Sequence, residues 1–239
     1  GYVSFTECNK QGNNSINRPL FENGLDIIIS MNNLIDILDK VRNHEQFSPL
    51  TQITSGRNAF GIVGKNTELE KITTDRYFNG AVSVRCAHEK IRYIAKNKIS
   101  KNKEIVDKWK IFTSKGNGGA GLLSDDKAVS ILGKSYIGKP LSACSDSLIP
   151  IGNFDTKEEA ENLQKYMSSK FLRFMVGILK VSQNVSQNVY QFVPMQDFTN
   201  NSDIDWNKPI SEIDKKLYDK YGLTPDEIEF IEQKIKPME

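Results

Sequence analysis

Apolar residues recur at steps of three and four positions across residues 156–180, which is the clearest hydrophobic pattern in the chain. The segment opens with Thr156 and Glu159, the pair expected of a capping box. The apolar positions in register are Ala160, Leu163, Met167, Phe171, Phe174 and Ile178. Residues 156–180 are therefore predicted to form one long helix with a buried stripe.

Weaker patterns predict the other elements. Residues 81–86 alternate apolar and polar positions, and residues 91–99 do so less regularly, so both are predicted strands. Further strands are expected at 111–113 and 147–154, and helices at 32–43, at 100–110 and from Thr224 onward. These elements predict a mixed α/β (α+β) fold with a central twisted mixed sheet, the long buried helix and a helical C-terminal extension. We expect residues 1–199 to form one domain, with residues 200–239 as an acidic arm and helices packed on it.

The composition is that of a globular protein, with 239 residues of which 38% are hydrophobic and 26% charged. The longest apolar run, residues 174–179, is far shorter than the roughly 18 residues that a membrane helix needs. The first residues lack the basic and apolar parts of a secretory signal, so a cytoplasmic protein is expected. Three widely spaced cysteines and two histidines without ligand-spaced partners predict neither a disulfide scaffold nor a metal site.

Charge is distributed unevenly, although the net charge is only +2. Residues 85–115 hold ten lysines and arginines against three acids, a local charge of +7. Residues 197–239 hold eleven acids against six lysines, a local charge of −5. A basic run of this kind is either a solvated surface or a polyanion-binding surface, so charge suggests nucleic acid without establishing it.

Catalytic motifs are weak. The glycine-rich residues 116–121 do not match a phosphate-binding P-loop, because Leu122 and Leu123 follow where Lys and Ser or Thr are required. Asp125-Asp126-Lys127 and Asp107-Lys108 have the composition of a metal-dependent nuclease centre, but such pairs arise by chance in a chain with 30 acids and 32 bases. No hydrolase elbow is present. A binding domain without catalytic or cofactor-binding residues is favoured over an enzyme.

Several segments in the C-terminal half follow a familiar order. They are Asp107-Lys108-Trp109-Lys110, Leu132-Gly133-Lys134, residues 147–162, Lys170-Phe171-Leu172-Arg173-Phe174, and residues 188–198, 217–224 and 228–232. Together they resemble the C-terminal region of large restriction-modification proteins with an adenine-specific DNA methylase domain, the region similar to the TaqI-like specificity domain. The resemblance covers roughly residues 48–239.

The resemblance implies a bacterial target-recognition fragment whose partners are duplex DNA and the upstream methylase domain of the same polypeptide. The family's glycine-rich S-adenosylmethionine loop and Asn-Pro-Pro-Tyr motif are absent here. The fragment is therefore expected to have no methyl transfer of its own and no cofactor. S-adenosylmethionine, with ATP and Mg²⁺ as further candidates, would belong to a parent methyltransferase, restriction endonuclease or both.

Target recognition needs cations on phosphates and Arg, Asn or Gln on base edges. The candidate base-reading residues lie on polar loops: Arg57, Asn58, Asn117, Gln183, Asn184, Gln187 and Asn188. The candidate phosphate contacts are Lys65, Lys98, Lys101, Lys115 and Lys180. Two alternatives stay open: a nuclease-bearing fragment of a restriction enzyme, and an interaction module whose acidic C-terminal helices dock to the methylase or helicase parts.

Overall fold

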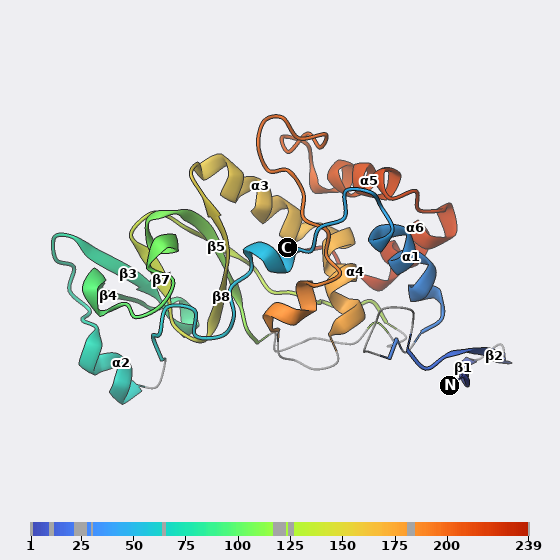
Figure 1. Ribbon diagram of the computed structural model, residues 1–239, viewed down its shortest axis with the longest axis horizontal. Helices are drawn as coiled ribbons and strands as arrows, with labels where there is room; N and C mark the ends of the chain where they lie inside the picture. Colours follow the sequence, from blue (N-terminus) through green and yellow to red (C-terminus); the bar gives the residue numbers. More distant parts are fainter. Residues whose placement is uncertain are drawn as a thin grey trace.

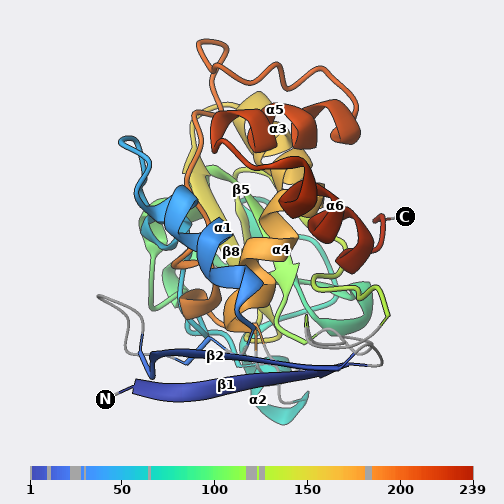
Figure 2. The same cartoon turned by 90° about the vertical axis from the view of Figure 1, so that its right-hand side faces the viewer.

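The computed structural model describes residues 2–9, 12–21, 28–29, 31–63, 66–116, 123, 127–180 and 185–238. Strands gather at one end of the elongated molecule, and most of the helices gather at the other (Figure 1). A hairpin of β1 (Tyr2–Asn9) and β2 (Gly12–Pro19) lies at the periphery of the helical end (Figures 1 and 2). The predicted mixed α/β class is confirmed.

Two three-stranded sheets replace the single central sheet that the sequence predicts. In the first, β3 (Ala81–Arg85) pairs antiparallel with β4 (Ile91–Ala95) and parallel with β7 (Ser142–Cys144). In the second, β5 (Trp109–Ser114) pairs antiparallel with both β6 (Tyr136–Gly138) and β8 (Leu148–Phe154). All four predicted strands are confirmed, although the strand predicted at 91–99 ends at Ala95.

The predicted long helix is two helices, α3 (Lys157–Ser168) and α4 (Lys170–Leu179). The break is at Ser169, whose ψ of 146° is extended and whose side chain caps α4 by accepting from the Leu172 amide. Every residue of the predicted stripe is nevertheless buried, so the hydrophobic pattern was read correctly across the break. The capping box predicted at Thr156 is also confirmed, and the helix predicted from Thr224 begins there with a second capping box.

The helix predicted at residues 100–110 is wrong. Only a short 3-10 helix forms there, η4 (Lys103–Asp107), and Ser100 does not cap it. Lys108 is already extended, and Trp109 pairs with Phe154 as the first residue of β5. Pairing between strands overrides the local helical spacing of the apolar residues.

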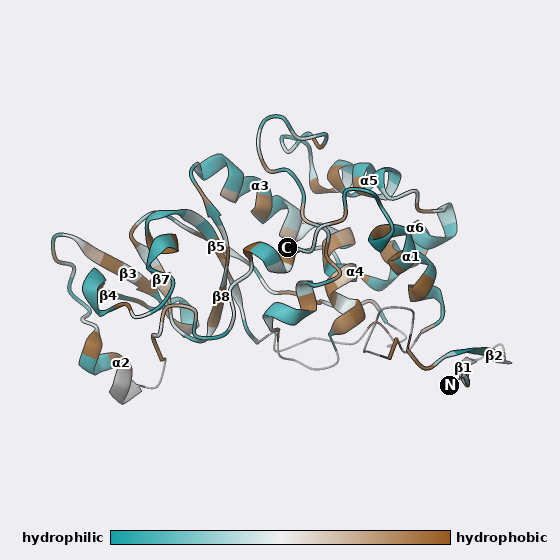
Figure 3. Ribbon diagram, in the orientation of Figure 1, coloured by the Kyte–Doolittle hydropathy of each residue, from teal (hydrophilic) through white to brown (hydrophobic). Residues whose placement is uncertain are grey.

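The hydrophobic interior has two clusters. The larger one packs α1 (Asn33–Arg42), α3, α4, α5 (Ile210–Lys220) and α6 (Pro225–Lys234) against β5 and β8. The smaller one lies between the β4-β3-β7 sheet and the segments that carry Phe60 and Ile99, next to α2 (Asn66–Ile72). Figure 3 shows mostly hydrophobic residues on α4 and mostly hydrophilic residues on α3. Within the described ranges, no helix is long and apolar enough to cross a membrane.

Candidate nucleic-acid interface

A loop of residues 56–61, called here the 56–61 loop, carries the first two candidate base-reading residues. It follows the 3-10 helix η1 (Leu50–Ile53), and its approach is fixed by β8: Thr54 forms a bridge with Ile151, and the Ser55 amide donates to the Pro150 carbonyl at 3.0 Å. The loop turns tightly, because the Gly61 amide donates to the Asn58 carbonyl at 3.1 Å. A rigid strand therefore supports one end of this loop.

The 3-10 helix η5 (Gln187–Tyr190) lies beside one side of the loop. The Gln187 Nε2 donates to the Thr54 carbonyl at 2.6 Å and to the Thr51 carbonyl at 3.3 Å. A Cβ added at Gly56 would lie 3.6 Å from Gln187 Oε1. Gln187 thus acts as a structural tether as well as a candidate reader, and the exposed Asn188 follows it directly.

A lysine-bearing turn of residues 98–102, called here the lysine turn, lies against the other side of the loop. The Asn102 Nδ2 donates to the Ala59 carbonyl at 2.7 Å. Ser100 packs so closely on Gly61 that a Cβ there would lie 1.9 Å from its Oγ. Lys98 and Lys101, both predicted phosphate contacts, are exposed on this turn.

The two residues at the tip of the loop differ in exposure. Arg57 is exposed, and the described residues offer its guanidinium no ion-pair partner. Asn58 is half-buried in the left-handed conformation, with a φ of 53°. Its Oδ1 is buried and accepts no hydrogen bond within the described part of the chain. The Asn58 Oδ1 therefore has acceptor capacity that the described residues leave unused.

The other predicted contacts lie less favourably or cannot be placed. Lys180 is only 3% exposed, and its burial lowers the pKa of the ammonium, so it does not present a surface charge to a phosphate. Lys115 is half-buried where β5 ends, and its carbonyl accepts from the Val185 amide at 2.7 Å, close to η5. Lys65, Asn117, Gln183 and Asn184 lie outside the described residues.

Much of the basic run at residues 85–115 is not available to a polyanion. Arg92 is 5% exposed and pairs with Asp75 at 2.9 Å, while Lys96 pairs with Asp107 and Lys108 with Asp155. Lys110 is fully buried. Its Nζ lies within hydrogen-bonding distance of four backbone carbonyls, those of Ile105, Val106, Lys108 and Lys139, and burial lowers its pKa to about 8. The local charge of the sequence therefore overstates the surface charge.

The candidate nuclease acids gain no support. Asp107 is paired with Lys96, and Asp125 and Asp126 fall outside the described residues. Among the residues that can be described, no three acidic, cysteine or histidine side chains gather as metal ligands would. Cys86 and Cys144 are buried free thiols, and burial raises the pKa of each.

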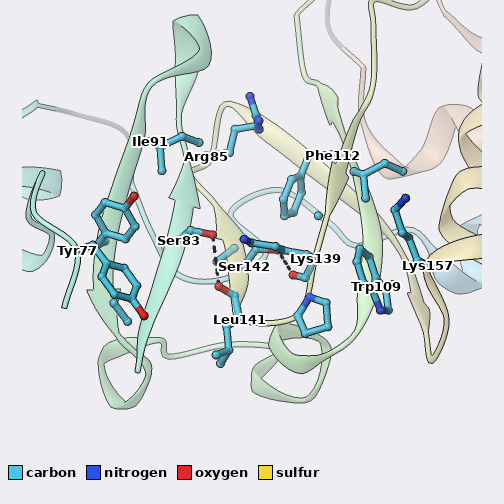
Figure 4. A pocket seen from close by; sticks show the side chains of 16 residues that line it. Tyr77, Ser83, Arg85, Ile91, Trp109, Phe112, Lys139, Leu141, Ser142 and Lys157 are labelled. Carbon is cyan, nitrogen blue, oxygen red and sulfur yellow. Dashed lines mark hydrogen bonds between the residues drawn. The ribbon is translucent and has the colours of Figure 1, made fainter. Parts of the chain in front are cut away.

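A hollow of about 730 Å³ between the two sheets was not anticipated from the sequence. Figure 4 shows Tyr77 on one side of it and Trp109 and Phe112 on the other. Tyr93 packs edge to face on Tyr77, with ring centroids 5.6 Å apart. The cations that line the hollow are Arg85, Lys139 and Lys157, and no Asp or Glu belongs to its lining among the described residues.

The sequence holds only a faint signal for this hollow. Tyr77 and Ile91 are exposed large hydrophobic residues, and Leu141 joins them at the same hollow from a segment 50 positions further along. Alternation in β3 and β4 predicts that one face of the strands is polar, but it does not reveal which distant segment faces it. The hollow depends on tertiary structure.

The sequence was compared with known protein families and with curated proteins. No model of a known protein family matches the sequence, and a search of curated proteins found no match.

Proposed function

We propose that this chain is the DNA target-recognition domain of a bacterial restriction-modification protein, in which a methylase domain precedes it. One arrangement carries the proposal: Asn102 of the lysine turn donates to Ala59 in the 56–61 loop, and Gln187 of η5 donates to Thr54, just before that loop. These hydrogen bonds connect three segments, distant in the sequence, that carry candidate base-reading and phosphate-binding residues. The resemblance of residues 48–239 to the TaqI-like specificity region agrees with this arrangement.

The chemistry of these side chains suits duplex DNA. Arg57 is exposed at the tip of the loop, and a guanidinium makes two hydrogen bonds to guanine in the major groove. Asn188 offers the amide group that pairs with adenine. Lys98 and Lys101 supply the sequence-independent attraction to phosphates, which weakens as salt rises.

The proposed role requires no catalysis by this chain. S-adenosylmethionine, with ATP and Mg²⁺ as further candidates, would be bound by other parts of a parent adenine methyltransferase or restriction endonuclease. The methylase would form the opposite wall of the DNA cleft, and the protein would act in the cytoplasm, where its target DNA lies.

A salt titration tests the proposal. Binding of the chain to a mixed-sequence duplex should weaken steeply with salt, and Lys101→Ala should lower both the affinity and the salt dependence. Lys216→Ala is the matched control, because Lys216 is also an exposed lysine and lies on α5, in the acidic part of the chain. Equal binding by both variants would contradict the proposed surface.

A further inference from the structure

We propose that the hollow between the two sheets binds a nucleotide, with its base between the aromatic walls and its phosphate on the lysine and arginine side chains. This inference does not rest on the proposed function. The ligand class is a planar heteroaromatic base that carries a phosphate. The source is either a free nucleotide or an unstacked nucleotide within a single strand, and the test below separates the two.

The aromatic walls are the first argument. Tyr77 is 67% exposed although its ring is large and apolar, and it holds an edge-to-face contact with Tyr93. Trp109 is half-buried on the opposite side, next to the buried ring of Phe112 (Figure 4). Flat rings on two sides of a hollow provide stacking surfaces for a base. A binding energy of about 1–3 kcal/mol per stacked base is typical of such sites.

The charge of the lining is the second argument. Lys139 is exposed and has no carboxylate partner among the described residues. Arg85 lies over the ring of Tyr136 at 4.3 Å, and Lys157 is paired with Glu161 at 2.6 Å on the outer surface of α3. Glu161 offsets the charge of Lys157, so Lys139 and Arg85 supply the positive charge of the lining, which favours an anionic ligand over a neutral one. The positive charge of the lining also disfavours an apolar peptide without acidic residues as the occupant.

Polar groups at the floor complete the site. The Ser83 hydroxyl donates to the Leu141 carbonyl at 3.3 Å, and the Ser142 hydroxyl donates to the Lys139 carbonyl (Figure 4). The first bond joins β3 to the segment before β7, and the second closes the turn by which that segment enters β7. The volume of about 730 Å³ lies within the range of small-molecule binding sites, and it is larger than a crevice that holds one water molecule.

The hollow is separate from the 56–61 loop. Side chains alternate along β3, so Val82 and Val84 point into the smaller hydrophobic cluster together with Phe60 of the loop, whereas Ser83 and Arg85 line the hollow. The two sites are therefore on opposite faces of the same sheet. A change in the hollow can be tested without altering the DNA-binding surface.

Trp109 provides the readout. The chain has two tryptophans, and Trp206 is 4% exposed in the larger hydrophobic cluster, so a ligand in the hollow should quench chiefly Trp109. The probes are adenosine monophosphate and a single-stranded oligomer of eight deoxyadenosines. Saturable quenching by the monophosphate at the same affinity as the oligomer identifies a free-nucleotide site. Binding of the oligomer at least tenfold tighter identifies a single-strand site.

Variants decide whether the quenching comes from the hollow. Tyr77→Ala and Lys139→Ala should each weaken binding by about five- to tenfold, because they remove a stacking surface and a phosphate partner. Tyr2→Ala and Lys216→Ala are the matched controls, since Tyr2 is 78% exposed on the hairpin and Lys216 is exposed on α5. Affinity for duplex DNA should be the same in the two tyrosine variants. In the two lysine variants it should change only by the small, equal effect of losing one positive charge. The proposal is overturned if neither probe gives saturable quenching, or if the two hollow variants bind like the controls.

Discussion

The Asn102 Nδ2 donates to the Ala59 carbonyl at 2.7 Å, a contact between residues 43 positions apart that ties the lysine turn to the 56–61 loop. Asn102 has a φ of 46°, a left-handed conformation that asparagine tolerates better than most residues. The side chain therefore meets two requirements at once: a turn that accepts this backbone and a donor that reaches the loop.

Asn102→Asp should break this link while keeping the turn, because aspartate also tolerates the left-handed region but cannot donate when ionised. The loss of one hydrogen bond to the part-buried Ala59 carbonyl should cost about 1–2 kcal/mol of unfolding free energy in urea. Affinity for duplex DNA should fall as well. Asn97→Asp adds the same charge on the exposed neighbouring 3-10 helix and serves as the control. Equal unfolding free energies of the two variants would show that the hydrogen bond from Asn102 to Ala59 does not stabilise the fold.

Gly61→Ala tests how tightly the loop packs on the lysine turn. Gly61 has a φ of 74°, and an added Cβ would lie 1.9 Å from Ser100 Oγ. Gly80 has nearly the same backbone, with a φ of 75°, but nothing lies within 4 Å of its added Cβ. Both substitutions should cost about 1–2 kcal/mol from backbone strain, and Gly61→Ala should cost more because of the clash. Thermal unfolding of both variants measures the difference, which should shrink when Ser100→Ala is added to Gly61→Ala.

Asp214 should make stability depend on pH in the direction opposite to an ordinary surface carboxylate. Burial raises its pKa to about 6, although its carboxylate accepts from the Lys170 and Phe171 amides at the start of α4. Because the folded pKa is above the unfolded value, the folded state binds more protons between about pH 4 and 6. The contribution of Asp214 is therefore fully present below about pH 4 and declines as pH rises through 6.

Asp214→Asn removes this titration. The unfolding free energy of the parent chain relative to the variant should increase by about 2 kcal/mol when the pH is lowered from 7 to 4. Denaturant unfolding at a series of pH values gives that difference directly. A difference that stays constant, or that shrinks toward low pH, would show that Asp214 has an ordinary or lowered pKa in the fold.

Removal of residues 200–239 should abolish cooperative unfolding, because α5 and α6 place Ile213, Leu217 and Ile231 in the larger hydrophobic cluster. The control deletion is residues 1–20, since none of the hairpin residues whose burial is described belongs to either cluster. Calorimetry of the two truncated chains compares them. A sharp transition without residues 200–239 would favour the alternative in which these helices are a separate docking arm.

Sequence patterns predicted the features that depend on residues close together along the chain. The capping box at Thr156, the helix start at Thr224 and the apolar stripe of residues 160–178 need only neighbours along the chain, and all were found. The break at Ser169 was missed because α4 gains its first-turn acceptors from Asp214, which is 45 positions away. The helical spacing before Trp109 was misleading for the same reason, since pairing with Phe154 decides its conformation.

The candidate interface was predictable in part. Loop composition pointed to Arg57 and Asn58, but only the fold shows that Asn102 donates to their loop and that Gln187 donates to Thr54 just before it. Counting charges along the chain could not distinguish an exposed lysine such as Lys101 from the fully buried Lys110. Burial is a property of packing, so a one-dimensional charge run sets only an upper limit on the surface charge.

Selection from a randomised duplex library tests the central claim most directly. The chain is bound to the library at low and then at moderate salt, and the retained duplexes are sequenced. The account predicts an enriched motif whose recovery falls as salt rises, and Arg57→Ala should relax the preference at one base pair by about 1–3 kcal/mol. No retained DNA at low salt, or the same motif and strength with Arg57→Ala and Asn188→Ala, would contradict target recognition through the 56–61 loop and η5.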